Sequence, residues 1–373
     1  MVQFIDLAAQ YKNLKEDIDK NIQKVLNHGK YIMGPEVWEL ESKLAEYVGV
    51  KHCISCSNGT DALLMPLMAW GIGEGDAVFT TPFTFIATAE VVSLLGATPV
   101  FADIDPHTYN IDPVKLEEAI NKVISEGKFK PKAIIPVDLF GLPADYERIE
   151  AIAEKYGLKI LEDAAQGFGG VYKGRRAGSF GDAASTSFFP AKPLGCYGDG
   201  GAIFANNDDL AAVLKSIRVH GQGSDKYDNV RIGLNARIDT IQTAVLLPKL
   251  KAFMEYELDA RNRFAAMYTE GLMDVVKTPV VPEGLVSSWA QYSVLAKSEE
   301  ERDVLREKLK AENIPTMVYY VKPLHLQAAY CGLGYKKGDF DVSENVSSRI
   351  FSLPIHPYLE EDVVRIVIET ICK

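Results

Sequence analysis

The most constraining feature of the sequence is a regular alternation of apolar runs and amphipathic stretches between residues 50 and 165. The apolar runs are short and nearly continuous, which is typical of strands that are buried on both faces. Strands are expected at 52–57, 77–81, 98–104, 132–140 and 158–163, with helices between them at 60–71, 88–96, 112–125 and 145–157. This alternation predicts an α/β domain with a mainly parallel sheet that helices cover on both faces.

The pattern of apolar runs and turns changes in the rest of the chain. Residues 178–205 contain short β-like runs separated by Gly-rich turns, and a long helical stretch follows at 238–272. Further on, expected strands at 289–296 and 316–320 accompany a helix at 299–313 and a final helix. A chain of 373 residues usually forms two or more domains, so we predict a large domain over 1–250 and a smaller C-terminal α+β domain over 251–373.

Charge and composition argue against several classes of function. Lys and Arg total 40 against 51 Asp and Glu, a net charge of −11, which disfavours nucleic acid or an anionic membrane as the main partner. No apolar run reaches the roughly 18–20 residues of a membrane span, and the acidic start resembles no signal peptide, so a cytoplasmic protein is expected. The 5 cysteines and 6 histidines lack the spacing of a metal site, so no metal is expected.

Polar residues gather where the predicted strands end, which is the edge at which open α/β sheets bind ligands. The stretch SNGTD (57–61) turns from a strand into a helix, so the free N–H groups of Gly59, Thr60 and Asp61 can form an anion site. The same pattern is compatible with an ordinary helix cap by Ser57 or Thr60. The turn is no Walker loop, because no Gly-Lys-Ser/Thr follows it.

A strand-end carboxylate is the second candidate. Asp163 closes the apolar run at 158–163, and a carboxylate in such a place needs a cationic partner to remain ionised. Asp103 and Asp105 follow another strand and satisfy the same criterion. Spacing alone does not choose among the three.

Lys192 is the third candidate, because it stands in the apolar, Gly-rich stretch FFPAKPLGCYGDGG (188–201). A desolvated lysine has a lowered pKa and can attack a carbonyl, although a lysine whose stem merely lies on apolar surface gives the same pattern. An anion site, a carboxylate and such a lysine on one sheet together fit a ligand with a phosphate, a ring nitrogen and an aldehyde. Pyridoxal 5′-phosphate has all three groups. Phe85, just past a strand end, would cover its ring or belong to the core.

The chain resembles the DegT/DnrJ/EryC1/StrS aminotransferases, pyridoxal-phosphate enzymes that make amino sugars on nucleotide carriers. The motifs that carry the resemblance are HGKYIMGPEVWELESKLAEYVG, SNGTDAL, TPFTFIATAE, FADIDPHTYNIDP, LEDAAQ, SFFPAKPLGCYGDGGAIF, RVHGQG, GLNARIDTIQTA and SLPIHPYL. It implies the aspartate-aminotransferase-like architecture of fold type I, with a mainly parallel seven-stranded sheet in the large domain. It also implies a homodimer with active sites at the interface.

The resemblance further implies roles for individual residues. Lys192 matches the lysine that binds the cofactor as a Schiff base, and Asp163 matches the partner of the pyridinium nitrogen. Some relatives are dehydratases with His in place of this lysine, so Lys192 indicates transamination. The other implied cofactor contacts are Gln166 to the ring hydroxyl, Phe85 to the ring face, Gly59, Thr60, Asp61 and Ser187 to the phosphate, and Asn235 to the phosphate in the other subunit.

For the substrate, the motifs are most similar to the branch that aminates C3 of UDP-2-acetamido-2-deoxy-3-oxo-D-glucuronic acid with L-glutamate as donor, for bacterial surface polysaccharide such as the O-antigen of lipopolysaccharide. Arg237 would pair with the uronate carboxylate or the diphosphate, or form an interface ion pair. Tyr319 and Tyr320, which stand where relatives often have HYP, and nearby Lys322 and His325 are candidate substrate contacts. The alternatives are a C4 aminotransferase of a UDP- or dTDP-4-keto-6-deoxyhexose, and a regulatory protein that binds pyridoxal phosphate on the same fold.

Overall fold

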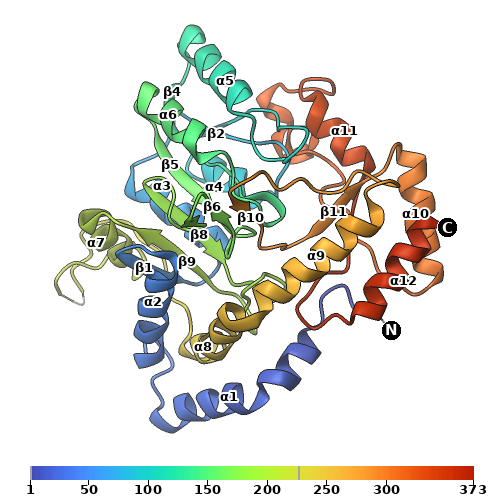
Figure 1. The fold of residues 1–373 in the computed structure, drawn as a ribbon. Helices are drawn as coiled ribbons and strands as arrows, with labels where there is room; N and C mark the ends of the chain where they lie inside the picture. Colours follow the sequence, from blue (N-terminus) through green and yellow to red (C-terminus); the bar gives the residue numbers. More distant parts are fainter. Residues whose placement is uncertain (1, 226) are drawn as a thin grey trace.

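The computed structural model describes residues 2–225 and 227–373, and a central sheet organises its large domain (Figure 1). The strands of this sheet are β1 (His52–Cys56), β2 (Asp76–Thr80), β3 (Thr98–Phe101), β4 (Lys130–Ile134), β5 (Lys159–Asp163), β8 (Ala183–Ser187) and β9 (Gly201–Ala205). These seven strands lie in the order β1-β9-β8-β5-β4-β2-β3. β9 runs antiparallel to β1 and β8, whereas all the other neighbours pair in parallel. The predicted mainly parallel sheet is therefore confirmed.

Helices cover both faces of this sheet, as the nearly continuous apolar strands predict. One face carries α3 (Gly59–Ala69), α4 (Ala87–Leu94) and α7 (Asp208–Ile217); the other carries α2 (Pro35–Val48), α5 (Pro113–Glu126), α6 (Tyr146–Tyr156) and α8 (Thr240–Ala252). Successive strand residues face opposite ways. Accordingly, Ile54 packs with the apolar residues of α3 and α7, and Cys53 packs with those of α2 and α8.

A long helical segment connects the two domains. α8 continues through a π-helical turn, Phe253–Glu257, into α9 (Leu258–Leu272), and α1 (Leu7–His28) packs along α8. In Figure 1, α9 runs from the region of the sheet toward the C-terminal helices. The predicted boundary at residue 250 falls within this segment.

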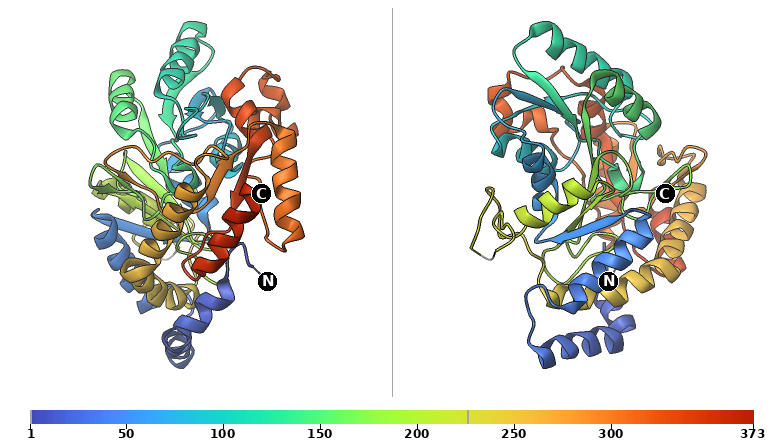
Figure 2. Two further views of the ribbon diagram at one scale, coloured as in Figure 1. Left: turned by 45° about the vertical axis from the view of Figure 1, so that its right-hand side comes forward. Right: turned by 90° about the vertical axis from the view of Figure 1, so that its left-hand side faces the viewer.

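The C-terminal domain has its own apolar core, built from residues between Phe264 and Ile371. Its elements are β11 (Tyr292–Leu295), β12 (Ile350–Leu353), α10 (Glu299–Ala311), α11 (Asp341–Arg349), α12 (Glu361–Cys372) and the 3-10 turns η3 (Leu324–Leu326) and η4 (Ala328–Leu333). Both chain termini lie beside this domain (Figure 2). The expected strand at 316–320 is wrong, because only Met317 forms an isolated bridge, to Ser352.

Two small features complete the architecture. A three-stranded sheet joins β10 (Leu285–Val286) to β6 (Val171–Tyr172) and β7 (Arg175–Arg176), and a 3-10 turn, η1 (Leu139–Gly141), follows β4. Within the described chain, no helix has the length and apolar character that crossing a membrane requires.

A buried ion pair fixes the outer strand of the sheet. Arg218, which follows α7, donates from Nη1 to Glu41 Oε1 of α2 at 2.5 Å and to the Ser55 carbonyl of β1 at 2.9 Å. Arg218 is 2% exposed and Glu41 6% exposed. Removing one member of a buried pair leaves the other charge uncompensated, which is more costly than losing a surface pair.

We therefore expect Arg218→Met to lower the free energy of unfolding by about 3–5 kcal/mol. Urea denaturation followed by circular dichroism measures the change. Lys115→Met is the matched control, because it removes an exposed pair with Glu118 and should leave the unfolding midpoint unchanged. Equal midpoints for Arg218→Met and the unmodified protein would show that the ion pair does not stabilise this edge.

Candidate active site

The strand register brings three predicted site segments to one edge of the sheet. Cys56, at the end of β1, and Ser187, at the end of β8, both pair with Gly201, the first residue of β9. The SNGTD turn therefore follows β1 at the edge where β8 leads into the turn that carries Lys192. β5 lies beside β8 and ends at the same edge with Asp163.

The start of α3 offers two free amide groups beside a hydroxyl. Asn58 is the N-cap, and its Oδ1 accepts the Asp61 N–H at 2.8 Å, so the expectation of a cap by Ser57 or Thr60 is wrong. This bond also engages the N–H that Asp61 was expected to offer to an anion. In the described chain, no protein acceptor pairs with the N–H of Gly59 or Thr60. A Cβ on Gly59 would lie 2.6 Å from Ser187 Cβ, so only glycine allows this approach.

Asp163 is a buried carboxylate held in one orientation. Its Oδ2 accepts from Thr88 Oγ1 at 2.8 Å, and its Oδ1 accepts from the Ala165 N–H at 3.2 Å. Burial raises the pKa of Asp163, while these two hydrogen bonds and the Lys192 cation oppose the rise. Sequence reasoning missed Thr88. The available signal was the spacing of Thr84 and Thr88, which stand four residues apart; their hydroxyls lie 3.1 Å from each other in the structure.

Lys192 is partly buried and lies near this carboxylate. Burial lowers its pKa, and the Asp163 charge partly opposes that effect.

The other two candidate carboxylates, Asp103 and Asp105, bind backbone N–H groups elsewhere. Asp103 accepts the N–H groups of Val342 and Ser343 at the start of α11. Asp105 accepts the N–H groups of His107 and Thr108 in a turn.

Gln166 links the site to the C-terminal domain. Its Oε1 accepts the Phe140 N–H at 2.8 Å, and its Nε2 donates to Tyr320 OH at 2.9 Å. Nε2 keeps a second hydrogen for another acceptor.

Phe85 is 57% exposed, so the interpretation of this ring as a core residue is wrong.

The structure separates the remaining predicted residues into two groups. Asn235 and Lys322 are exposed, and Tyr319 and Arg237 are partly buried, with Arg237 Nη2 donating to Asn235 Oδ1 at 2.6 Å. His325 is 2% exposed, and its Nε2 lies 3.0 Å from Glu344 Oε1. The prediction that His325 contacts substrate is therefore not supported, because a neighbouring carboxylate already pairs with this buried ring.

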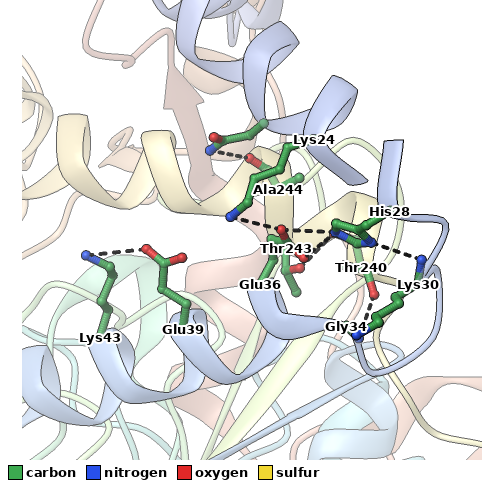
Figure 3. A network of polar contacts seen from close by, with 11 residues as sticks. Lys24, His28, Lys30, Gly34, Glu36, Glu39, Lys43, Thr240, Thr243 and Ala244 are labelled. Carbon is green, nitrogen blue, oxygen red and sulfur yellow. Dashed lines mark hydrogen bonds and ion pairs between the residues drawn. The ribbon is translucent and has the colours of Figure 1, made fainter. Parts of the chain in front are cut away.

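A polar network fixes the loop that precedes α2 (Figure 3). Glu36 is 1% exposed, and its carboxylate lies 3.2 Å from both Lys24 Nζ and His28 Nε2. The Gly34 N–H donates to Thr240 Oγ1, and the Tyr31 carbonyl accepts the Thr240 N–H. These bonds hold residues 31–34 against the start of α8, close in sequence to Arg237.

Behind the site, two buried carboxyl groups face each other. Asp138 Oδ1 accepts from Tyr146 OH and the Ala144 N–H, whereas its Oδ2 has no partner among the described residues. Glu162 accepts the N–H groups of Gly178 and Phe180. Burial raises the pKa of Asp138 to about 7, despite the hydrogen bonds that it accepts, and raises that of Glu162 well above its usual range. Two such groups share one proton more readily than both ionise.

This pair predicts a decline in stability as pH rises. The native pKa of Asp138, about 7, lies above its usual 3.8, so the native state binds the extra proton between about pH 4 and pH 7. The native state therefore loses stability as pH rises through that window. Asp138→Asn should reduce this decline by on the order of 2 kcal/mol, because the amide replaces the protonated acid. Urea unfolding at several pH values tests it, and identical slopes for both proteins would contradict it.

Comparisons with known proteins agree with this geometry. A match to the DegT/DnrJ/EryC1/StrS aminotransferase family covers residues 12–372. A relative from Pseudomonas aeruginosa, named UDP-2-acetamido-2-deoxy-3-oxo-D-glucuronate aminotransferase, is 49% identical over 98% of this chain and 98% of its own length. The crystal structure of a DegT DnrJ EryC1 StrS aminotransferase from Brucella abortus has a TM-score of 0.96 and 55% identity, covering 100% of this chain and 99% of that one.

A further solved structure bears on the cofactor. NtdA from Bacillus subtilis, with bound cofactor PMP, has a TM-score of 0.88 and 29% identity, covering 99% of this chain and 83% of that one. The residues here fit the pyridoxal form of that cofactor, because free N–H groups and Ser187 stand beside a buried carboxylate and a desolvated lysine. The chain has the fold of type I, belongs to the DegT/DnrJ/EryC1/StrS aminotransferase family and is a pyridoxal-phosphate-dependent aminotransferase.

Proposed function

We propose that this enzyme transfers the amino group of L-glutamate to C3 of UDP-2-acetamido-2-deoxy-3-oxo-D-glucuronic acid, for bacterial surface polysaccharide. The observation that supports this substrate is the 49% identity, over 98% of both chains, to the relative named for it. Lys192 supports transamination, because it places an amine of lowered pKa beside the buried Asp163 carboxylate.

Each side chain of the proposed site has a distinct task. Bound pyridoxal phosphate supplies an electron sink for the carbon that carries the amino group. Asp163, oriented by Thr88, holds the ring nitrogen in its protonated form. Lys192 Nζ, whose pKa burial lowers, accepts the proton from Cα of the donor and returns a proton later. Gly59, Thr60 and Ser187 would hold the phosphate, Gln166 Nε2 would donate to the ring hydroxyl, and the exposed Phe85 ring would cover the cofactor ring.

Lys192→Ala should reduce turnover by at least about a thousandfold, because both the covalent attachment point and the proton-transfer group are lost. Production of 2-oxoglutarate from L-glutamate measures the rate. Borohydride treatment of the unmodified protein should leave the cofactor on the peptide that contains residue 192, as read by mass spectrometry. Lys251→Ala, on the exposed side of α8, is the control and should retain full activity. Label on any other lysine would disprove the assignment.

Arg237 is the proposed contact for the uronate carboxylate. Its Nη2 donates to Asn235, whereas its Nε is buried and has no partner among the described residues, so the guanidinium has a donor left for a carboxylate. A guanidinium that binds the diphosphate instead would affect every nucleotide sugar equally. The two roles therefore differ in their substrate dependence.

Arg237→Gln should lower kcat/KM for the 3-oxo-uronate by about 10–100-fold, the usual effect of losing a charge-assisted hydrogen bond. It should change kcat/KM by less than about threefold for the matching 3-keto sugar that has a hydroxymethyl group in place of the carboxylate. An equal loss on both sugars would assign Arg237 to the diphosphate.

The same assay on the unmodified enzyme separates the alternative functions. Turnover of only 4-keto-6-deoxyhexoses would favour the C4 alternative, and absence of any glutamate half-reaction would favour the regulatory one.

We also propose a cytoplasmic homodimer in which Asn235 reaches the phosphate of the partner subunit's site. Exposed apolar side chains near this segment support it, since Ile232 is 85% exposed and Ile32, bridged to Asp239, is 52% exposed. Apolar groups of this kind are commonly covered by a protein partner. The ordered loop of Figure 3 would hold Ile32 in place for that contact.

A further inference from the structure

The turn that carries Lys192 is fixed by its own backbone. The Phe188 N–H donates to the Gly200 carbonyl, the Cys196 N–H to the Phe188 carbonyl and the Lys192 N–H to the Phe189 carbonyl, each at 2.8 Å. These bonds make residues 188–200 one compact unit. A displacement at Tyr197, five residues beyond the lysine, would therefore disturb the backbone that carries Lys192.

Tyr197 is also the residue at which α8 holds this unit. Gln242 Oε1 accepts the Tyr197 N–H at 2.9 Å, and Gln242 Nε2 donates to the Tyr197 carbonyl at 3.2 Å. One carboxamide thus binds both backbone groups of a single residue. The approach is so close that a Cβ on Gly198 would lie 2.8 Å from Gln242 Nε2.

Lys249 meets the same tyrosine two helical turns further along α8. It is 1% exposed, and its Nζ lies 4.8 Å from the centroid of the Tyr197 ring, with no hydrogen-bond partner among the described residues. Burial lowers the pKa of Lys249 to about 8, while the Glu257 carboxylate opposes that effect. Burying an amine in this way is unfavourable, and its attraction to the ring face partly compensates for the loss of hydration.

Glu257 extends this arrangement to other parts of the molecule. It is fully buried at the end of the π-helical turn between α8 and α9. Its Oε1 accepts from Gln10 Nε2 of α1 at 2.9 Å and from Tyr358 OH, which follows β12, at 2.7 Å. π-helical turns occur frequently at functional sites. The N-terminal helix and the C-terminal domain thus meet at a carboxylate close to Lys249.

We propose that Gln242 and Lys249 are positioning residues that hold the Lys192 turn through Tyr197, and that Glu257 couples this turn to the C-terminal domain through Tyr358. The inference rests on the proposed role of Lys192, because positioning matters for catalysis only if that amine reacts. The contacts of Gln242 and Lys249 with Tyr197, which we call the clamp, are present whatever the role of Lys192.

The first test is amide hydrogen exchange of the cofactor-free protein, read on peptides covering residues 189–200. Gln242→Ala removes both hydrogen bonds to the Tyr197 backbone, and Lys249→Met removes the contact with the Tyr197 ring, so each variant should speed exchange there by about tenfold. Methionine keeps most of the volume of Lys249 without the charge. Lys251→Met, exposed on the same helix, is the matched control and should leave exchange unchanged. Unchanged exchange in Gln242→Ala would overturn the clamp, whether or not Lys249→Met folds.

Tyr358→Phe tests the coupling, because it removes one hydroxyl in the C-terminal domain and leaves the Lys192 turn untouched. Exchange at 189–200 should rise about threefold, whereas a purely local role for Tyr358 would change exchange only near residue 358.

In the cofactor-loaded enzyme, the glutamate half-reaction of Gln242→Ala should slow about tenfold with KM within twofold. If borohydride labels another lysine while exchange behaves as expected, the proposed function fails and the clamp stands.

Discussion

Burial of a carboxylate and an amine at the same edge of the sheet is the constraint on which the site depends. Burial raises the pKa of Asp163 and lowers that of Lys192, so it disfavours the charged form of each group. Each charge also opposes the effect of burial on the other. A cationic ring nitrogen at Asp163 would keep that carboxylate ionised while leaving Lys192 free to lose its proton. The bonds from Thr88 and Ala165 fix the carboxylate before any ligand binds.

A second pair of buried carboxyl groups supports this arrangement from behind. A Cβ on Gly167 would lie 2.3 Å from Asp138 Cβ, so the turn that carries Gln166 packs directly against the Asp138–Glu162 pair. A shared proton leaves that pair with one negative charge instead of two. A second full charge would add to the repulsion on Asp163, the carboxylate next to Glu162 in the chain. The shared proton thus limits the charge repulsion on Asp163.

The sequence predicted the sheet well because local pattern and global fold agree there. Strands buried on both faces must be apolar throughout, and the expected run at 158–163 matches β5 at Lys159–Asp163. The run at 316–320 has the same β-rich composition, yet Tyr320 pairs with no neighbouring strand. Its hydroxyl instead accepts a hydrogen bond from Gln166 of the large domain. Three candidate aspartates could not be separated by spacing, because the helix that Asp103 caps lies some 240 residues away in the chain. Nothing in the sequence indicates that the His325 ring is buried beside Glu344, because the two residues belong to different elements, η3 and α11.

The polar contacts between the domains are directional, which apolar packing is not. Tyr320 bonds to Gln166, Asp103 accepts two N–H groups of α11, and Tyr358 bonds to Glu257 of the segment that connects the domains. Hydrogen bonds have narrow distance and angle ranges, whereas apolar surfaces can slide with little loss. The C-terminal domain is therefore held in a defined position relative to the sheet edge. Because Tyr320 lies in the same segment as Tyr319 and Lys322, its bond to Gln166 also fixes that segment relative to the sheet edge.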